Sequence, residues 1–490
     1  MIEEKLVEMV KKIQDYKCEM QDIEIKTAGG GCPKLYDSLS SFSNQDEGGT
    51  IILGLKEKDG FSVVGVYDIQ DLQQKVSAQC KQMEPEVRPL FTVAEIEGKF
   101  VLAVEVPGVD VSFRPVFYKG SGIWKGSYVR VGDADEPMNE YEIYTYEAFR
   151  RRIRDDLRVV QGAKVSFFQP ELVKKYLDAV KLERENLSSN TTDDEILELM
   201  GVTSEGLPTL SGVLVFSKYP QAYFPQLCIT AVVVPGTEMG DTGSDGERFL
   251  ANKRLTGTIS EMLSGAVAFV QRNMRVKTIV NDMGERKDKP ELPIKAVREV
   301  ILNALVHRDY SIHTEGSPIT ICMFSDRMEV SNMGGLYGRI SIDSLGKVHP
   351  ETRNPALANM LEILKETENR YSGIPTIRKE MKAAFLPDPV FSVMDGEFKV
   401  TLYNGSILNE NASYKEHRLL ELGDRDKKLL AYCATPRSRE EIITFMGYSQ
   451  YYTMSQIVQP LIEQGMLKMS LPEKPKSSKQ RYFSEKDDTF

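Results

Sequence analysis

Four charged side chains near the start of the chain have the types and the spacing that metal-dependent chemistry on a phosphodiester requires. Glu19 and Glu24 lie five residues apart, Lys26 follows two residues after Glu24, and Glu57 comes directly after the stretch "TIILGLK". Carboxylate oxygens from different segments can hold Mg²⁺ or Mn²⁺, and such a metal activates water and neutralises charge on the phosphate. We therefore interpret these four residues as candidate catalytic residues, with the three glutamates as metal ligands. Solvated charges at the edge of a strand would give the same pattern.

A second set of polar residues lies much later, on a segment whose apolar residues have helical spacing. In "EVILNALVHRD", Glu299, Asn303 and His307 recur every four residues and share one face of the predicted helix. The amide oxygen of an asparagine can ligate Mg²⁺, and a nearby glutamate can orient an attacking water. A polar stripe at the edge of an amphipathic helix is the alternative.

Two glycine turns follow that helix. They are "NMGGL", with Asn332, Gly334 and Gly335, and "YSGIP", with Ser372 and Gly373. Glycine lets backbone N–H groups come close to a phosphate, so the order of helix and turns indicates a phosphate-binding site. The sequence has no G-x-x-x-x-G-K-[ST] motif, which argues against a helicase motor of the P-loop type.

The elements that would position these residues belong to a long, soluble and acidic chain. Its 490 residues suggest about three domains, and 41% hydrophobic and 27% charged residues are typical of a globular protein. No apolar run is long enough to span a bilayer, and the charged start "MIEEKLVEMVKK" does not resemble a secretory signal. Six scattered cysteines without a C-x-x-C pair argue against a disulfide framework or a zinc ribbon and favour the cytoplasm. The net charge of −10 means that any nucleic acid must bind at local basic patches.

We expect an α+β protein of four parts. Residues 1–158 form a compact α+β unit that ends at the basic run "FRRRIRDDLR". Residues 159–290 form a connecting region in which "LSGVLVFSK" is predicted to be a strand, and residues 291–405 form a new unit of helices and strands. A polar linker then leads to residues 418–485.

The last part has the pattern of a winged helix. "SREEI" is a capped helix start, and two more predicted helices and a hairpin complete the pattern. A third helix of this kind enters the major groove of DNA, and basic residues on the wing contact phosphates. A winged helix that binds another protein is the alternative. With the basic residues of the first unit, the expected nucleic-acid contacts are Arg130, Arg150, Arg151, Arg152, Tyr451, Tyr452, Lys474, Lys476, Lys479 and Arg481.

The first unit resembles the Schlafen-type AlbA-like domain, which is described as DNA-binding in bacterial proteins. The resemblance covers roughly residues 15–145 and rests on "IEIKTAG", "LSSFSNQDEGGTIILGL" and "YVRVGDADEP", with the framework Phe42, Asn44, Gly48, Gly49, Gly54 and Gly65. In nucleases of the Schlafen family, three carboxylates and a divalent cation cut transfer and ribosomal RNA. By this resemblance Glu19, Glu24 and Glu57 occupy the three positions, although the animal nucleases have aspartate at the third. Those nucleases pair two half-domains around RNA, so a single copy here implies a dimer or a larger homo-oligomer.

The unit that contains Asn303 resembles a divergent GHKL-type ATPase, an α/β sandwich that is attached to AlbA-like domains in bacterial proteins labelled "RecG-like helicase". Glu299 and Asn303 match the family's N-box, whereas Asn332 stands where the family usually has the aspartate that reads adenine. The resemblance implies that ATP and Mg²⁺ bind there and that any hydrolysis is slow.

Two main functions follow from the sequence. The first is a nucleic-acid-binding protein with an ATP site that acts as a metal-dependent endoribonuclease in stress or phage defence. The second is an ATP-responsive, DNA-binding transcriptional regulator in which the acidic residues have no catalytic role. A nucleotide-dependent assembly module that binds no nucleic acid is a third hypothesis.

Overall fold

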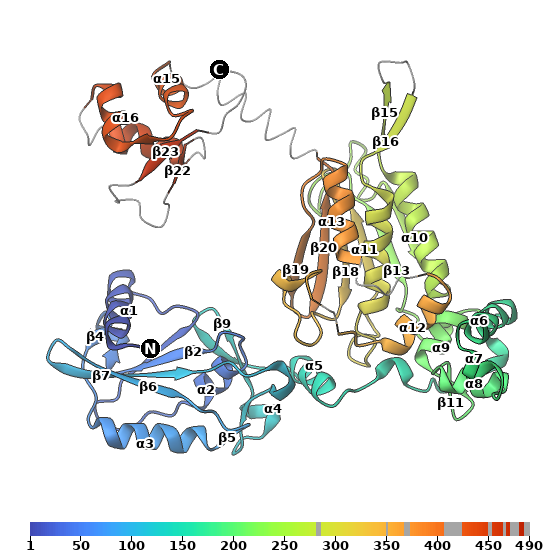
Figure 1. Ribbon diagram of the computed structural model, residues 1–490, viewed down its shortest axis with the longest axis horizontal. Coiled ribbons are helices and arrows are strands. Elements are labelled where there is room, and N and C mark those ends of the chain that lie inside the picture. Colours follow the sequence, from blue (N-terminus) through green and yellow to red (C-terminus); the bar gives the residue numbers. More distant parts are fainter. Residues whose placement is uncertain are drawn as a thin grey trace. The chain divides into compact units, whose positions relative to one another are not determined.

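The computed structural model describes residues 1–280, 286–348, 351–366, 373–405, 424–448, 453–463, 467–470 and 480–484. The chain divides into two compact units, Met1–Asn404 and Gly405–Phe490. The unit Met1–Asn404 contains two larger sheets, and these have separate cores (Figure 1). In the described ranges no helix is both long and apolar enough to cross a bilayer.

The N-terminal domain is a four-stranded sheet with helices on both faces (Figure 1). The strand order is β1-β2-β7-β6, with β1 parallel to β2 and the other neighbours antiparallel. Its main elements are α1 (Glu3–Tyr16), β1 (Ile23–Lys26), α2 (Tyr36–Ser43), β2 (Gly49–Leu53), α3 (Ile69–Cys80), β6 (Leu90–Ile96), β7 (Lys99–Val106), β9 (Tyr128–Val131) and β10 (Ala134–Pro137).

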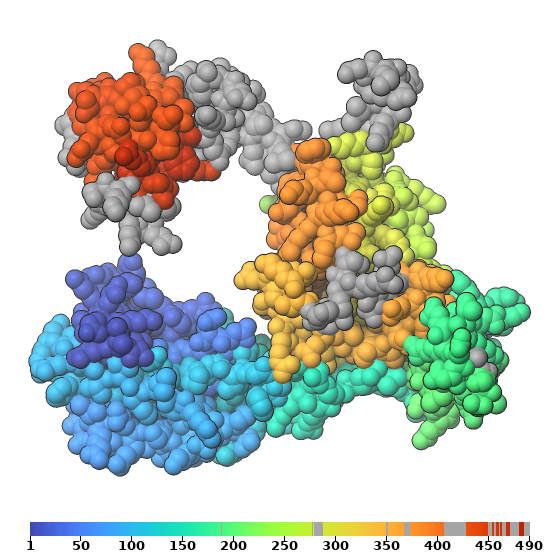
Figure 2. Space-filling view, viewed as in Figure 1, coloured from blue at the N-terminus to red at the C-terminus, as the bar shows by residue number. Residues whose placement is uncertain are grey.

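Alternating side chains explain why this sheet is covered on both faces. Along β2, Ile51 and Leu53 pack with α2 and α3 in one core, whereas Ile52 packs with α1 in the other. In the space-filling view α1 (dark blue) and the segment around α3 (lighter blue) form opposite outer surfaces of this domain (Figure 2). This packing fixes β1, and with it Glu24, against the rest of the domain.

The second sheet has six strands in the order β14-β13-β17-β18-β20-β19. The helices α10, α11 and α13 pack against one another, with α10 and α11 also in contact with the sheet (Figure 1). The elements are β13 (Ile229–Val233), β14 (Ala251–Leu255), α10 (Ile259–Asn273), α11 (Ile294–His307), β17 (Ile319–Met323), β18 (Arg327–Met333), α13 (Gly373–Ala383), β19 (Val390–Met394) and β20 (Glu397–Tyr403).

The boundary expected at residue 290 does not separate two cores. One continuous core extends from Val160 to Leu402, because β13 pairs in parallel with β17 across that position. The smaller helices of this core are α6 (Pro170–Glu183), α8 (Asp193–Leu199), α9 (Leu210–Phe216) and α12 (Pro355–Ile363), and a hairpin of β15 (Val276–Val280) and β16 (Arg286–Pro290) leaves the sheet.

The prediction of a strand at "LSGVLVFSK" is wrong, because these residues form helix α9. Thr209 caps the helix by accepting a hydrogen bond from the backbone N–H of Gly212 at 3.1 Å. Every residue of α9 is buried, so the segment is apolar on all sides and has no periodicity that would distinguish a helix from a buried strand.

The described residues of the C-terminal unit follow the order helix, strand, helix, helix, strand, strand, whereas the sequence predicts three helices and then a hairpin, without the short strand between the first two helices. The elements are α15 (Asp424–Tyr432), β21 (Arg437–Ser438), α16 (Arg439–Met446), a helical turn at Thr453–Val458 that continues into α18 (Gln459–Glu463), β22 (Lys468–Met469) and β23 (Arg481–Phe483). Ser438 and Glu441 form the expected capping box at the start of α16.

Candidate functional site

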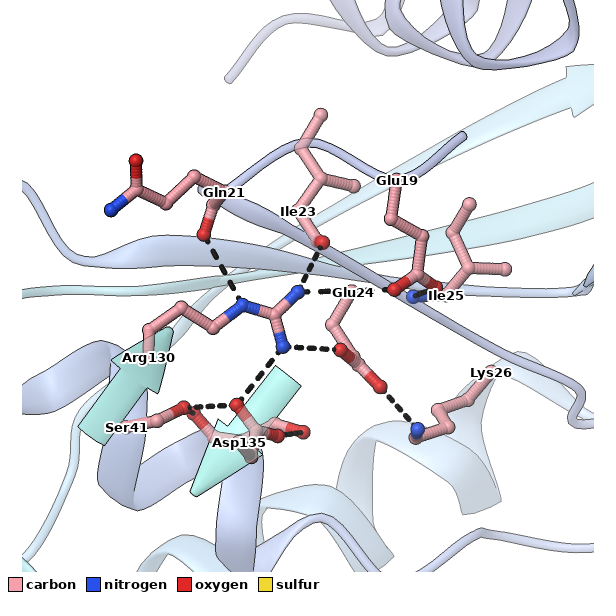
Figure 3. A network of polar contacts seen from close by, with 10 residues as sticks. Glu19, Gln21, Ile23, Glu24, Ile25, Lys26, Ser41, Arg130 and Asp135 are labelled. Carbon is pink, nitrogen blue, oxygen red and sulfur yellow. Dashed lines mark hydrogen bonds and ion pairs between the residues drawn. The ribbon is translucent and has the colours of Figure 1, made fainter. Parts of the chain in front are cut away.

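The acidic residues of the N-terminal domain surround a buried arginine (Figure 3). Arg130 lies on β9, and its side chain is 0% exposed. Its Nη1 donates to Glu24 Oε2 at 2.7 Å and to Asp135 Oδ1 at 3.0 Å. The other guanidinium nitrogens donate to the carbonyl oxygens of Gln21 at 3.3 Å and Ile23 at 2.9 Å. Arg130 therefore ties β9 and β10 to the start of β1.

Both oxygens of Glu24 are paired with cations. Oε2 contacts Arg130, and Oε1 forms an ion pair with Lys26 two residues along β1. Burial alone would lower the pKa of Lys26, but the hydrogen bond and the charge of Glu24 outweigh it and raise this pKa. Burial likewise opposes the charge of Arg130, and its carboxylate partners raise its pKa above the ordinary value.

Asp135, which the sequence analysis missed, is the second carboxylate on the guanidinium. It pairs with Arg130 in the β9–β10 register and accepts hydrogen bonds from Ser38 at 2.7 Å and Ser41 at 2.6 Å, both on α2. The sequence offers a signal, since Arg130 and Asp135 flank a short turn at Gly132 and so lie opposite each other in a hairpin.

Glu19 lies beside this network, and its negative charge is farther from Arg130 than that of Glu24. Its Oε1 accepts a hydrogen bond from the Ile25 N–H at 2.9 Å, and its Oε2 lies 3.8 Å from Arg130. Burial and the negative charge of Glu24 raise the pKa of Glu19 to about 7, with a smaller contribution from Glu57. Glu57 itself is exposed in a turn after the sheet. The structure thus brings Glu19, Glu24 and Lys26 together and places Glu57 near enough to act on Glu19.

These carboxylates do not fit a Mg²⁺ or Mn²⁺ site in this arrangement. Both oxygens of Glu24 are occupied, and the described residues include no group of three or more His, Cys, Asp or Glu that could hold a metal ion. The guanidinium of Arg130 supplies the positive charge that a cation would bring. The prediction that Arg130 contacts nucleic acid is wrong for this structure, because its side chain is enclosed.

The three other arginines that the sequence assigns to nucleic acid are exposed, and each has an acidic partner. Arg150 and Arg151 lie 3.6 Å and 2.6 Å from Glu147, and Arg152 lies 3.3 Å from Glu351. The contact with Glu351 links Arg152 to the domain that contains the six-stranded sheet.

A cavity of about 290 Å³ lies among α11, the glycine turn after β18 and the start of α13. Its size is close to the lower end of small-molecule sites. Seven of the eight residues that the sequence assigns to the ATP site line it: Glu299, Asn303, His307, Asn332, Gly334, Gly335 and Gly373. The eighth, Ser372, is outside the described residues.

Asn303 shows that this cavity is built for a polar ligand. Its Nδ2 atom is buried and has no hydrogen-bond partner among the described residues, an arrangement that costs free energy unless a ligand or water completes it. A Cβ atom on Gly373 would lie 3.1 Å from this nitrogen and 3.1 Å from Glu299 Oε2, so glycine keeps the space in front of both residues open. The unpaired Nδ2 donor fits a phosphate oxygen, and the carboxylate of Glu299 and the Oδ1 atom of Asn303 are oxygens that could hold Mg²⁺, so the residues present fit a nucleotide with Mg²⁺.

His307 lines the cavity with an exposed side chain, and protein atoms surround the ring at longer range. Burial lowers its pKa to about 4, and the positive charge of Arg353 acts in the same direction. The imidazole is therefore neutral at physiological pH and can accept a hydrogen bond. Asn332, also on the lining, is buried and donates from Nδ2 to the Met333 carbonyl at 3.0 Å.

Arg353 is the main residue of this cavity that the sequence analysis missed. It precedes Asn354 and Pro355, where α12 begins with proline in its first turn. Its Nη2 donates to the Gly335 carbonyl at 2.7 Å, so it holds the first glycine turn. An arginine directly before a helix start was the available signal, since loop residues at such ends often bind ligands.

In the C-terminal unit most of the predicted contacts cannot be placed, because Tyr451, Tyr452, Lys474, Lys476 and Lys479 are outside the described residues. The remaining one, Arg481, is half-exposed and pairs with Glu441 at 3.0 Å.

Comparisons with known proteins find two family matches, one in each of the regions that form the two larger sheets. Residues 19–139 match the family described as "Schlafen, AlbA_2", and residues 316–402 match HATPase_c_4, described as "Putative ATP-dependent DNA helicase recG C-terminal". No curated protein matches the chain.

Two solved structures are similar to it. The crystal structure of the DIP2311 protein from Corynebacterium diphtheriae is 20% identical over 93% of this chain and 92% of that one, with a TM-score of 0.40. The solution structure of the N-terminal domain of a putative ATP-dependent DNA helicase RecG-related protein from Nitrosomonas europaea is 26% identical over 27% of this chain and 92% of that one, with a TM-score of 0.23. The AlbA_2 match falls on the four-stranded sheet, and the recG C-terminal match falls on β17 to β20 of the six-stranded sheet, so we refer to the domain that contains the six-stranded sheet as the ATPase-like domain.

Proposed function

We propose that this protein binds nucleic acid and that ATP with Mg²⁺, bound in the α11 cavity, regulates that binding. The observation that carries the proposal is Asn303, whose buried and unpaired amide faces a cavity with Gly373 opposite. Glu299 and Asn303 would hold the magnesium ion, and the two glycine turns would receive the phosphates. When bound, the metal would reduce the negative charge of the triphosphate.

The N-terminal domain supports a binding role better than a catalytic one. Arg130 and Lys26 neutralise Glu24 within the protein, so these carboxylates repel a phosphate backbone less than three free ones would. Lys26 stays partly exposed at the edge of the network, where it can contact a phosphate. The C-terminal unit, if it acts as a winged helix, adds a second nucleic-acid surface.

The test measures binding of the full-length protein to labelled duplex DNA and to labelled tRNA by fluorescence anisotropy, with and without ATP and Mg²⁺. We expect ATP to change the affinity for at least one of them by about fivefold or more, within the usual range of allosteric coupling. Asn303→Ala should abolish the ATP effect, whereas Asn273→Ala, on α10 and outside the cavity, should keep it. Absence of ATP binding, or of nucleic-acid binding, would refute the proposal.

A metal-dependent endoribonuclease is the second candidate; it requires Glu24 to exchange Arg130 or Lys26 for the metal ion, and the raised pKa of Glu19 is the observation that favours it. Burial and the charges of Glu24 and Glu57 raise this pKa to about 7, and a bound cation would relieve that repulsion. Incubation of the protein with labelled tRNA, Mn²⁺ and ATP tests it. Cleavage that is lost in Glu24→Gln and kept in the exposed control Glu136→Gln would establish the nuclease. Intact tRNA under all these conditions would exclude this activity on tRNA and leave the binding role.

A further inference from the structure

The cavity in the ATPase-like domain has an uneven charge distribution. Among the described residues that line it, Arg353 is the only lysine or arginine, whereas Glu299 and Glu351 are both acidic. His307 supplies no charge at neutral pH, because burial lowers its pKa to about 4. A magnesium ion held by Glu299 and Asn303 would compensate only part of the charge of a triphosphate. Of the side chains that the structure describes in the cavity, Arg353 is therefore the cation that the remaining negative charge can contact.

Arg353 contacts one carboxylate, one aromatic ring and one backbone carbonyl. Its Nη1 lies 3.4 Å from Asp309 Oδ2, which is long for a hydrogen bond between ionised groups. Its guanidinium carbon lies 5.1 Å from the ring centre of Tyr337, and its Nη2 donates to the Gly335 carbonyl. The side chain is 11% exposed, so it reaches the cavity while remaining mostly enclosed.

Asp309 connects this arginine to a different helix. Its Oδ2, the atom nearest Arg353, also accepts a hydrogen bond from the Tyr141 hydroxyl at 2.8 Å, and its Oδ1 accepts one from the Ser311 N–H at 2.8 Å. Tyr141 lies on α5 (Glu140–Arg150), which begins directly after the residues that match the AlbA_2 family. Burial, followed by the charge of Asp309, raises the pKa of Tyr141, so the phenol stays protonated and continues to donate. Asp309 would keep two partners if Arg353 left it.

We propose that Arg353 binds the phosphates of the nucleotide and that Asp309 competes with them for its guanidinium, which couples nucleotide binding to the Asp309–Tyr141 contact on α5. The inference rests on the proposed ATP site and names its phosphate-binding residue and its route to the helix that follows the AlbA_2 domain. A charged hydrogen bond of this kind is worth about tenfold or more in affinity. Because coupling is reciprocal, changes at Asp309 or Tyr141 must change nucleotide affinity.

The experiment compares the binding of ATP with Mg²⁺ and the binding of adenosine by isothermal titration calorimetry on the full-length protein. Arg353→Ala should weaken ATP binding about tenfold and adenosine binding less than twofold, because adenosine has no phosphate. Arg353→Lys should retain part of the ATP affinity, since it keeps the charge but loses the planar fork. Arg298→Ala, an exposed arginine on α11 that does not line the cavity, is the matched control and should bind both ligands like the wild type.

Two further variants test the competition, and they have opposite expected signs. Asp309→Asn removes the competing charge and should tighten ATP binding about threefold. Tyr141→Phe removes a hydrogen bond to Asp309, so Asp309 should hold Arg353 more strongly and ATP binding should weaken about threefold. Both effects are within the range of energetic coupling between neighbouring groups. Neither should change adenosine binding, which a general loss of structure would change. If the wild type binds no ATP, the proposed function fails with the inference. If it binds ATP with equal affinity in Arg353→Ala, or if Asp309→Asn weakens binding, the inference alone is refuted.

Discussion

Replacement of Glu19 by glutamine should stabilise the N-terminal domain, and the effect should depend on pH. In the folded protein, burial and the charge of Glu24 raise the pKa of Glu19 from 4.5 to about 7. The folded state therefore binds more protons at this position than the unfolded state between pH 4.5 and 7. Stability falls as pH rises through this window, and the full loss is present above pH 7.

The magnitude follows from the two pKa values. One pKa unit corresponds to about 1.4 kcal/mol, so a fully enclosed carboxyl with this difference would destabilise the protein by roughly 3.4 kcal/mol at pH 8. Glu19 is 12% exposed at its side chain and lies near the surface, so screening by solvent reduces the figure to about 1–2 kcal/mol. Glutamine keeps an oxygen that can accept the hydrogen bond from the Ile25 N–H, so the variant loses the charge and little else.

The single tryptophan makes the measurement specific, because Trp124 lies in the N-terminal domain. Urea unfolding of the full-length protein, followed by tryptophan fluorescence at pH 5 and pH 8, reports on this domain alone. The free energy of unfolding of Glu19→Gln should exceed that of the wild type, and we expect this difference to increase by about 1–2 kcal/mol from pH 5 to pH 8. Glu136→Gln, which removes an exposed carboxylate on β10, should show no such growth. An equal effect of Glu19→Gln at both pH values would show that the pKa of Glu19 is not raised.

Three further outcomes test the two sites. Arg130→Met should destabilise the N-terminal domain by about 3–5 kcal/mol, because it leaves buried carboxylates without their cation. The same Trp124 unfolding assay measures this change, and a loss of stability below 1 kcal/mol would contradict the ion-pair network. Gly373→Ala should weaken ATP binding in calorimetry while leaving the circular dichroism spectrum unchanged, because the new Cβ would lie 3.1 Å from Asn303 Nδ2; unchanged affinity would argue against Asn303 as a ligand. Nuclear magnetic resonance of the His307 ring should show no protonation between pH 6 and 8, because burial lowers its pKa to about 4, and a midpoint near 6.5 would contradict its enclosure.

Local patterns predicted which residues of the ATPase-like domain line one cavity. Residues four apart on a helix must share a face, so Glu299, Asn303 and His307 had to point in one direction. The glycine turn with Gly334 and Gly335 follows an apolar segment, so it was expected at the end of a strand, and it follows β18. The position of Arg353 before a helix start can be read from the sequence, but its contact with Gly335 cannot, because that contact depends on a loop whose path is determined by the packing of α12.

At the acidic site of the N-terminal domain, local patterns predicted only part of the arrangement. Spacing predicted that Glu24 and Lys26 share a face of β1, and their ion pair confirms it. The arrival of Arg130 from a strand more than a hundred residues later is a tertiary contact, which no local pattern encodes. A sequence that shows three glutamates therefore suggests a metal, whereas the fold brings an arginine to the same carboxylates. The error at α9 is of the same kind, because complete burial removed the periodicity that distinguishes helix from strand.

The two arginines differ in a way that predicts where the protein responds to a ligand. Arg130 has 0% exposure and short hydrogen bonds to carboxylates on both sides, so a ligand would have to break several buried contacts to move it. Arg353 lines a cavity, and its Nη1 lies 3.4 Å from Asp309 Oδ2, so a phosphate in the cavity would compete with this buried carboxylate for the guanidinium. Because Asp309 passes the consequence to Tyr141, the change would begin in the ATPase-like domain and reach α5. The AlbA_2 domain would then receive the signal through its connection to α5, while its own ion-pair network stays intact.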